Sequence, residues 1–99
     1  MPKQKVNDIE IYYEVHGQGD PLILIMGLRR NVEWWYSQIP TLSKHFKLLA
    51  FDNRGAGLSD KPKTDYSIHL FADDTAELMQ FLNIKRAHVL GISMGGYIA

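Results

Sequence analysis

Polar and apolar residues alternate at the start of this chain. Residues 9–15 switch regularly between hydrophobic and hydrophilic side chains, and residues 3–7 do so more weakly. A period of two residues is typical of a strand with one buried face, because successive side chains point to opposite sides of a sheet. The two segments are joined around Asn7 and Asp8, residue types that favour tight turns. The chain is therefore predicted to open with an antiparallel hairpin.

Three later segments predict further strands. Residues 22–26 are apolar at every position, which is typical of a strand that is covered on both faces in a parallel sheet. Residues 46–51 form a second short strand, and residues 86–92 form a third that runs into a glycine-rich turn.

Helical spacing of apolar residues occurs between these strands. In the first such segment, one helix face is formed by Trp35, Ile39, Leu42 and Phe46. Pro40 removes a backbone donor here, so we predict an irregular turn that is followed by a helix over about residues 40–44. Because large aromatic side chains usually fill a core, Trp35 is expected to be buried, whereas the position of Trp34 is left open.

The second helical segment begins after Ser67, a residue type that caps helix N-termini well. Its apolar stripe consists of Phe71, Thr75, Leu78 and Leu82. We predict a helix that runs to about Leu82 and is ended by Asn83. Asp73 and Asp74 lie early in this helix, and they cannot act as a paired acid and base because adjacent helical positions point in different directions. We interpret both as surface or cap charges.

The order of these elements predicts the fold class. After the hairpin come a strand, a helix, a strand, a helix, a strand and the start of a helix. Such alternation is typical of the α/β class, and it predicts a mostly parallel sheet with an N-terminal antiparallel hairpin and flanking helices. Functional residues of parallel sheets gather at the carboxyl ends of the strands. In this sequence those ends are Gly27, Asp52 and Ser93.

Composition narrows the possible functions. The 99 residues suffice for one domain at most, and lysine plus arginine balance aspartate plus glutamate at 11 each, which argues against nucleic-acid binding. The absence of cysteine excludes a disulfide framework and a thiolate metal site. The longest apolar run, residues 22–26, is far too short to span a membrane. We expect a soluble cytoplasmic protein with no cofactor and no metal site.

The strongest candidate for chemistry is the segment over residues 91–96, Gly-Ile-Ser-Met-Gly-Gly, which follows the last predicted strand. A serine in a tight strand-to-helix turn adopts a strained backbone conformation and projects above the sheet, and such a turn leaves no room for side chains two residues before or after it. Gly91 and Gly95 supply that room. Unpaired N–H groups at the helix start would stabilise an oxyanion. Ser93 is therefore the candidate nucleophile.

The glycine-containing loop over residues 52–60 allows two interpretations. Gly55 and Gly57 have the spacing of the first half of a dinucleotide-binding motif. Asp60 stands at the third glycine position, however, and residues 61–63 intervene before any helix. We therefore favour a tight loop that turns the chain across the ends of the strands, rather than a phosphate-binding loop.

The chain resembles the α/β-hydrolase family along essentially its whole length. The resemblance rests on the apolar strand that ends in residues 26–28, on the loop over residues 52–60 and on the turn over residues 91–96. It is most similar to small serine esterases, enol-lactonases, C–C bond hydrolases and cofactor-free haloperoxidases, whose turn also reads Gly-x-Ser-Met-Gly-Gly. Haloalkane dehalogenases are less similar, because they have an aspartate at the position of Ser93. The resemblance implies a serine hydrolase that acts on an ester, lactone or related small-molecule acyl substrate.

The resemblance also implies roles for single residues. The oxyanion would be held by the N–H after the nucleophile and by one from the loop after the third strand, which are those of Met94 and Leu28. In this family the acid and the histidine of the triad follow the nucleophile, but residues 94–99 contain neither. We interpret residues 1–99 as an incomplete α/β-hydrolase domain that ends just after the nucleophile turn, and we expect these residues alone to be inactive.

The chain's histidines, His16, His45, His69 and His88, all precede Ser93. His88 opens the strand that leads to Ser93, which places it roughly 15 Å away at about 3.3 Å per residue. All four are interpreted as surface or strand-packing residues. An alternative function stays open, that of a non-catalytic fragment or pairing module, because the last strand would be an exposed sheet edge. Such a fragment is expected to self-associate.

Overall fold

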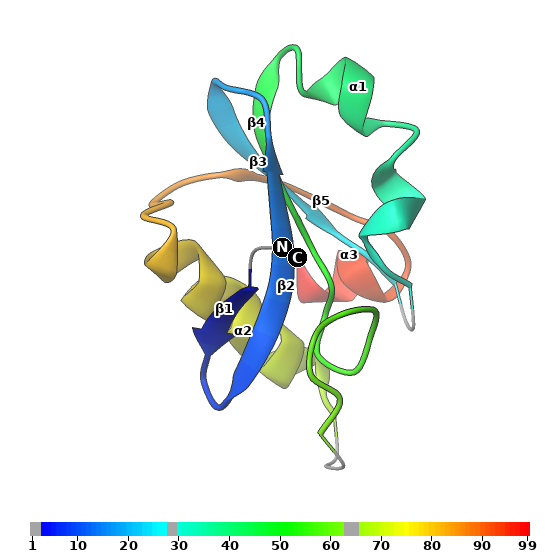
Figure 1. Cartoon of the computed structure of the whole chain (residues 1–99), viewed down its shortest axis with the longest axis vertical. Coiled ribbons are helices and arrows are strands. Elements are labelled where there is room, and N and C mark those ends of the chain that lie inside the picture. Colours follow the sequence, from blue (N-terminus) through cyan, green and yellow to red (C-terminus); the bar gives the residue numbers. More distant parts are fainter. Residues whose placement is uncertain (1–2, 28–29, 63–65) are drawn as a thin grey trace.

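A five-stranded mixed sheet forms the centre of the molecule in the computed structural model, which describes residues 3–27, 30–62 and 66–99 (Figure 1). Its strands are β1 (Lys3–Val6), β2 (Ile9–His16), β3 (Asp20–Ile25), β4 (Phe46–Phe51) and β5 (His88–Gly91). They lie in the order β1-β2-β4-β3-β5. β2 pairs antiparallel with β1 and β4, and β3 pairs parallel with β4 and β5. The predicted α/β class is confirmed.

The opening hairpin is closed by a tight turn at Asn7 and Asp8. Val6 pairs with Ile9 across this turn, and Asn7 has a φ of 53°, a conformation that asparagine adopts more readily than most residues. Val6, Ile9 and Ile11 are buried. The alternating sequence therefore places one face of the hairpin against the core, as predicted.

Helices cover both faces of the sheet (Figure 1). They are the 3₁₀ helix η1 (Val32–Trp35) and the α-helices α1 (Ile39–Leu42), α2 (Ile68–Phe81) and α3 (Met94–Ile98). η1 and α1 occupy the segment for which an irregular turn and a short helix were predicted. The Ser67 hydroxyl accepts a hydrogen bond from the Leu70 N–H and so caps α2 as expected. Trp35 is 1% exposed, which confirms its place in the core, whereas Trp34 is 56% exposed.

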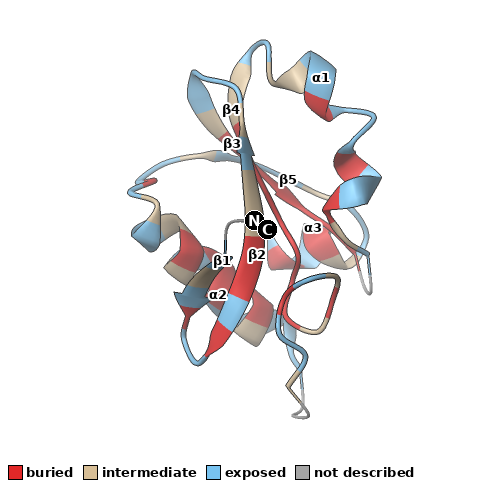
Figure 2. Cartoon of the chain, viewed as in Figure 1, coloured by how far each residue is buried: buried red, intermediate tan, exposed pale blue. Residues whose placement is uncertain are grey.

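The parallel strands have a hydrophobic cluster on each side, which explains their nearly continuous apolar sequences. Ile23 and Ile25 of β3 belong to the cluster that includes residues of α2 and α3. Leu22 and Leu24 point to the other cluster, which includes residues of η1 and α1. Burial is therefore concentrated along the middle of the sheet (Figure 2).

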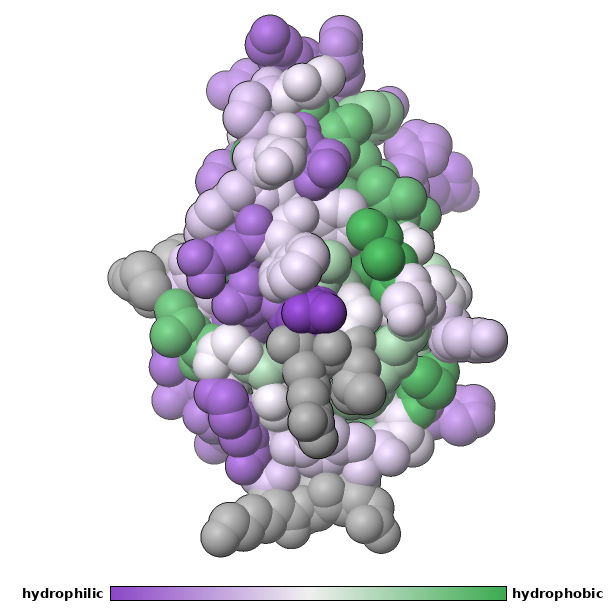
Figure 3. Space-filling model, turned by 90° about the vertical axis from the view of Figure 1, so that its right-hand side faces the viewer, coloured by the Kyte–Doolittle hydropathy of each residue, from purple (hydrophilic) through white to green (hydrophobic). Residues whose placement is uncertain are grey.

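β5 lies at one edge of the sheet and pairs only with β3 within the described part of the chain. Val89, Leu90 and the following Ile92 are each more than 40% exposed, and hydrophobic side chains form several separate patches on one face of the molecule (Figure 3). The self-association expected from such an edge stays a prediction. None of the helices described is long and apolar enough to cross a bilayer.

Candidate active site

Ser93 stands at the junction of β5 and α3, in the position that the sequence predicted. Its backbone has φ 56° and ψ −119°, a region that side-chain-bearing residues rarely adopt. The Ile92 N–H donates to the Ile25 carbonyl at 3.1 Å, which ties the turn to the end of β3. The serine itself is exposed. The chain thus presents one hydroxyl group at the carboxyl edge of the sheet, on a strained backbone.

Gly91 and Gly95 are required by close backbone contacts around this turn. A Cβ atom on Gly91 would overlap the Gly95 carbonyl oxygen, and one on Gly95 would overlap the Ile25 carbonyl oxygen. Neither glycine has a positive φ angle. Positive φ occurs at Ser93 instead. The strain is stored in the serine, and the glycines supply only space.

One of the two N–H groups that are expected to hold an oxyanion lies within the described residues. The Gly95 and Gly96 N–H groups donate to the Ile92 and Ser93 carbonyls at 2.9 Å each, whereas the Met94 N–H has no acceptor among the described residues. A Cβ atom on Gly27 would lie 3.3 Å from Ser93 Cβ, so the end of β3 reaches the serine. Leu28, the second expected donor, lies outside the described residues. The roles of Ser93, Met94 and Leu28 stay predictions.

Asp52 organises the loop after β4. One carboxylate oxygen accepts from the Val32 N–H and the other from the Leu58 N–H, both at 2.8 Å. Burial raises the pKa of Asp52, although these two hydrogen bonds oppose the shift. The Ser59 hydroxyl donates to the Asp52 carbonyl and accepts from the Tyr12 N–H. Because a carboxylate of the chain itself takes up the Leu58 N–H, the structure favours the tight loop over a phosphate cradle.

Arg54 and Asp74 form an ion pair inside the fold. Arg54 Nε lies 2.7 Å from Asp74 Oδ2, and the two side chains are only 4% and 2% exposed. A hydrogen bond from Asn7 Nδ2 to Asp74 Oδ1 joins the hairpin turn to α2. The interpretation of Asp74 as a surface or cap charge is therefore wrong, because the loop after β4 inserts Arg54 against the helix. Asp73, in contrast, is exposed.

A second polar cluster lies on β2. The Glu14 carboxylate accepts hydrogen bonds from the Tyr12 and Tyr36 hydroxyls and contacts His16 Nε2 at 2.9 Å. Burial raises the pKa of Glu14, but these hydrogen bonds outweigh it and hold the pKa below its ordinary value. The bond to Glu14 raises the pKa of Tyr36 to about 12. This cluster was not predicted from the sequence, although Tyr12, Glu14 and His16 share one strand face through their two-residue spacing.

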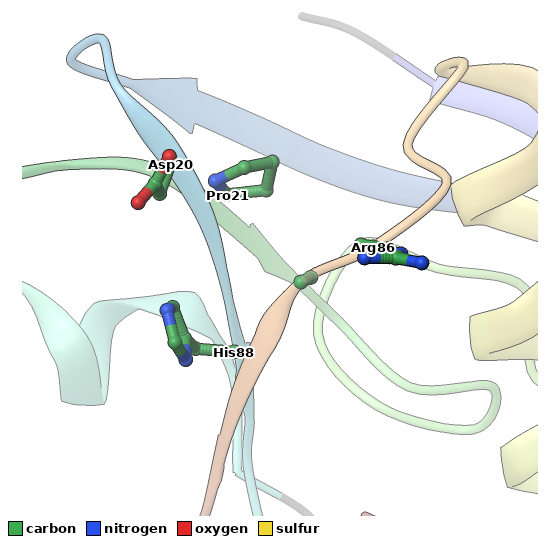
Figure 4. Close-up of a pocket in the computed structure, with 5 residues that line it drawn as sticks. Asp20, Pro21, Arg86 and His88 are labelled. Carbon is green, nitrogen blue, oxygen red and sulfur yellow. The ribbon is translucent and has the colours of Figure 1, made fainter.

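His88 lies away from Ser93, as predicted. His88 begins β5, at the strand end opposite Ser93, and packs edge-on against Phe46 with ring centroids 5.9 Å apart. It lines a cavity of about 260 Å³ with Asp20 and Arg86, and in Figure 4 Asp20 and His88 lie on one side of the strands while Arg86 lies on the other. Within the described ranges, no three histidine, aspartate or glutamate side chains are grouped to hold a metal ion.

Comparison with known proteins identifies the family to which the chain belongs. Residues 20–99 match the family described as alpha/beta hydrolase fold. The chain belongs to this family. The resemblance inferred from the sequence is thereby confirmed.

Relatives in this family carry several different names. The chain is 33% identical over 98 residues to a putative carbamate hydrolase of Azorhizobium caulinodans, covering 99% of this chain and 37% of that protein. It is 36% identical to a putative non-heme chloroperoxidase of Synechocystis, covering 88% of this chain and 32% of that protein. The enol-lactonase structure from Burkholderia xenovorans superimposes with a TM-score of 0.95 at 37% identity, covering 98% of this chain and 39% of that one. The chain therefore spans about a third of the length of the curated relatives that it matches.

Proposed function

We propose that the protein is a serine hydrolase that cleaves an ester, lactone or related acyl substrate through Ser93. The observation that carries this proposal is the strained backbone of Ser93, with φ 56° and ψ −119°, just after the carboxyl end of β5, which pairs parallel with β3. Strain of this kind is costly and is characteristic of functional positions. The names of the enol-lactonase and carbamate hydrolase relatives are consistent with acyl chemistry.

The proposed reaction begins when Ser93 Oγ attacks the substrate carbonyl carbon while a histidine removes the hydroxyl proton. The carbonyl oxygen becomes an oxyanion, which the Met94 and Leu28 N–H groups hold. The same histidine then protonates the leaving group, and water hydrolyses the acyl-enzyme. In α/β-hydrolases the acid and the histidine follow the serine in the chain, so we propose that they come from sequence beyond residue 99.

A fluorophosphonate probe tests this assignment in the longest natural polypeptide that contains this sequence. We expect the probe to label Ser93, and Ser93→Ala to abolish labelling and to lower turnover of a nitrophenyl ester on the order of 10⁶-fold. Ser37→Ala, which removes another exposed serine hydroxyl, serves as the matched control and retains both signals. Undiminished hydrolysis by Ser93→Ala would overturn the proposal. Residues 1–99 alone are expected to show no turnover above a Ser93→Ala control, because residues 94–99 contain neither the histidine nor the acid that follow the nucleophile in this family.

A further inference from the structure

The backbone that follows β3 borders the space around the Ser93 hydroxyl. A Cβ atom built on Gly27 would lie 3.3 Å from Ser93 Cβ and 3.8 Å from Ser93 Oγ. The Arg30 N–H donates to the Gly27 carbonyl at 3.2 Å, which closes a turn at this point. A shift of this backbone therefore changes the room that a substrate carbonyl finds beside the serine.

Two consecutive side chains of the loop after β4 hold this backbone on both sides of Gly27. Asn53 Nδ2 donates to the carbonyl of Met26, the preceding residue, at 3.2 Å. Asp52 Oδ1 accepts from the N–H of Val32, the first residue of η1, at 2.8 Å. The segment that passes the serine is thus anchored before and after its closest approach, and both anchors come from the neighbouring strand.

Asp52 is itself fixed to the sheet and to its own loop. Its backbone N–H donates to the Tyr12 carbonyl in β2 at 3.0 Å, and its second carboxylate oxygen accepts from the Leu58 N–H at 2.8 Å. A Cβ atom on Gly57 would overlap this oxygen, so the loop is folded closely over the carboxylate. The residue is 1% exposed. Asp52 is therefore a firm support, because its position follows from β2 and β4.

The choice of an acid at this position carries information. Burial raises the pKa of Asp52, which shows that the charged form is placed here at a cost in free energy. A carboxylate has two acceptor oxygens and no donor, so it binds backbone N–H groups from two different loops at once. The amide of an asparagine would offer one oxygen and set its NH₂ group against the second N–H. Only the acid joins the segment after β3 to the loop after β4 in this way.

We propose that Asp52 and Asn53 are positioning residues for the reaction at Ser93, which they serve by holding the Gly27 backbone at its observed place beside the hydroxyl. The inference rests on the proposed hydrolase function and deepens it, because it adds two residues that act through the Gly27 backbone rather than on the substrate. Reacting groups must be held to within a fraction of an ångström, and a misplacement of about 1 Å costs on the order of 10²-fold in rate. These side chains therefore set kcat as well as stability.

Asp52→Asn tests the inference in the longest natural polypeptide that contains this sequence. The substitution keeps the size of the side chain but leaves one of the N–H groups of Val32 and Leu58 without its acceptor. We expect kcat for nitrophenyl butanoate to fall about 30-fold while KM changes less than about twofold, because the shift affects the reacting geometry more than binding. Rates are taken per folded protein, at a temperature below the melting transition of each variant. A folded Asp52→Asn protein with the wild-type kcat would overturn the inference.

Asp74→Asn is the matched control. It removes the other buried carboxylate on which the same loop depends, through Arg54, but leaves both hydrogen bonds of Asp52 in place. We expect it to lower stability and to keep kcat and KM at their wild-type values. An equal fall in kcat in both variants would refute a specific positioning role and indicate general loosening of the loop.

A second variant covers the case in which Asp52→Asn does not fold. Asn53→Ala releases the Met26 carbonyl and leaves Asp52 intact, so it frees one side of the segment. We expect a fall of about fivefold in kcat at an unchanged KM, because the anchor at Val32 remains. The inference is contradicted if Asn53→Ala folds and turns over substrate at the wild-type rate.

The rate of fluorophosphonate labelling separates this inference from the proposed function. In Asp52→Asn we expect the probe still to label Ser93, but about 30-fold more slowly than in the wild type. Labelling of Ser93 at the wild-type rate in this variant defeats the positioning role and leaves Ser93 as the nucleophile. Failure of the probe to label Ser93 in the wild-type protein defeats the proposed function, and the positioning role with it.

Discussion

Two turns at the carboxyl edge of the sheet are held in place by different physical means. The loop after β4 is fixed by side-chain charge, through the Asp52 carboxylate and the pair between Arg54 and Asp74. In the turn after β5, the Ser93 side chain makes no capping hydrogen bond, and close backbone contacts at Gly91 and Gly95 fix the geometry. The first turn should therefore be more sensitive to a change of charge than the second.

Gly95→Val is expected to have the largest effect. Its Cβ would overlap the Ile25 carbonyl oxygen, and a backbone atom of a buried strand cannot move aside as a flexible side chain can. We expect a loss of at least about 4 kcal/mol in the free energy of unfolding, or no soluble protein. Gly96→Ala is the matched control, because the nearest atom to a Cβ there is 3.9 Å away. Chemical denaturation measures both, and a Gly95→Val protein as stable as the control would contradict the steric account.

Asp74→Asn tests the charge-dependent turn. The substitution keeps the size of the side chain but leaves the buried Arg54 guanidinium without its counter-charge, so we expect a loss of about 3 kcal/mol. Asp73→Asn changes the neighbouring, exposed carboxylate and is expected to cost less than about 0.5 kcal/mol. Equal effects of the two variants in urea denaturation would show that the buried pair does not hold this loop.

Glu14→Gln extends the comparison to a partly buried charge and should have the smallest effect, about 1 kcal/mol at neutral pH. Hydrogen bonds hold the folded pKa of Glu14 below its ordinary value of 4.5. Its stabilising contribution is therefore complete above that value and is lost as the pH falls through the lower, folded pKa. The difference in unfolding free energy between wild type and variant should shrink between about pH 6 and about pH 3. A difference that does not change with pH would mean that the Glu14 charge is not responsible.

The strands and the nucleophile turn could be predicted because their signals are local. The apolar composition of residues 22–26 is enough to predict a strand that is covered on both faces. Gly91 and Gly95 each lie two residues from Ser93, a spacing that a crowded turn requires. The internal partners of charged residues could not be predicted in the same way. Asp74 is bound by Asn7, 67 positions away along the sequence, so its burial depends on the completed fold.

The burial of Asn53 shows the same limit more sharply. Nothing in the loop sequence distinguishes a solvated asparagine from one that is 3% exposed and donates to the Met26 carbonyl. Local patterns therefore locate the carboxyl edge of the sheet, but three-dimensional packing decides which polar side chains there are buried.

The pairing of β3 with β5 also has a kinetic consequence. Leu22 lies opposite His88, so this pairing closes a loop of more than sixty residues, whereas the β1–β2 hairpin closes locally. Closure of long loops delays pairing during folding. Like β1, β5 has only one neighbour in the described sheet, so fewer strand contacts hold it than hold the central strands. We therefore expect the geometry of Ser93 to be acquired late in folding, after the β1–β2 hairpin has closed.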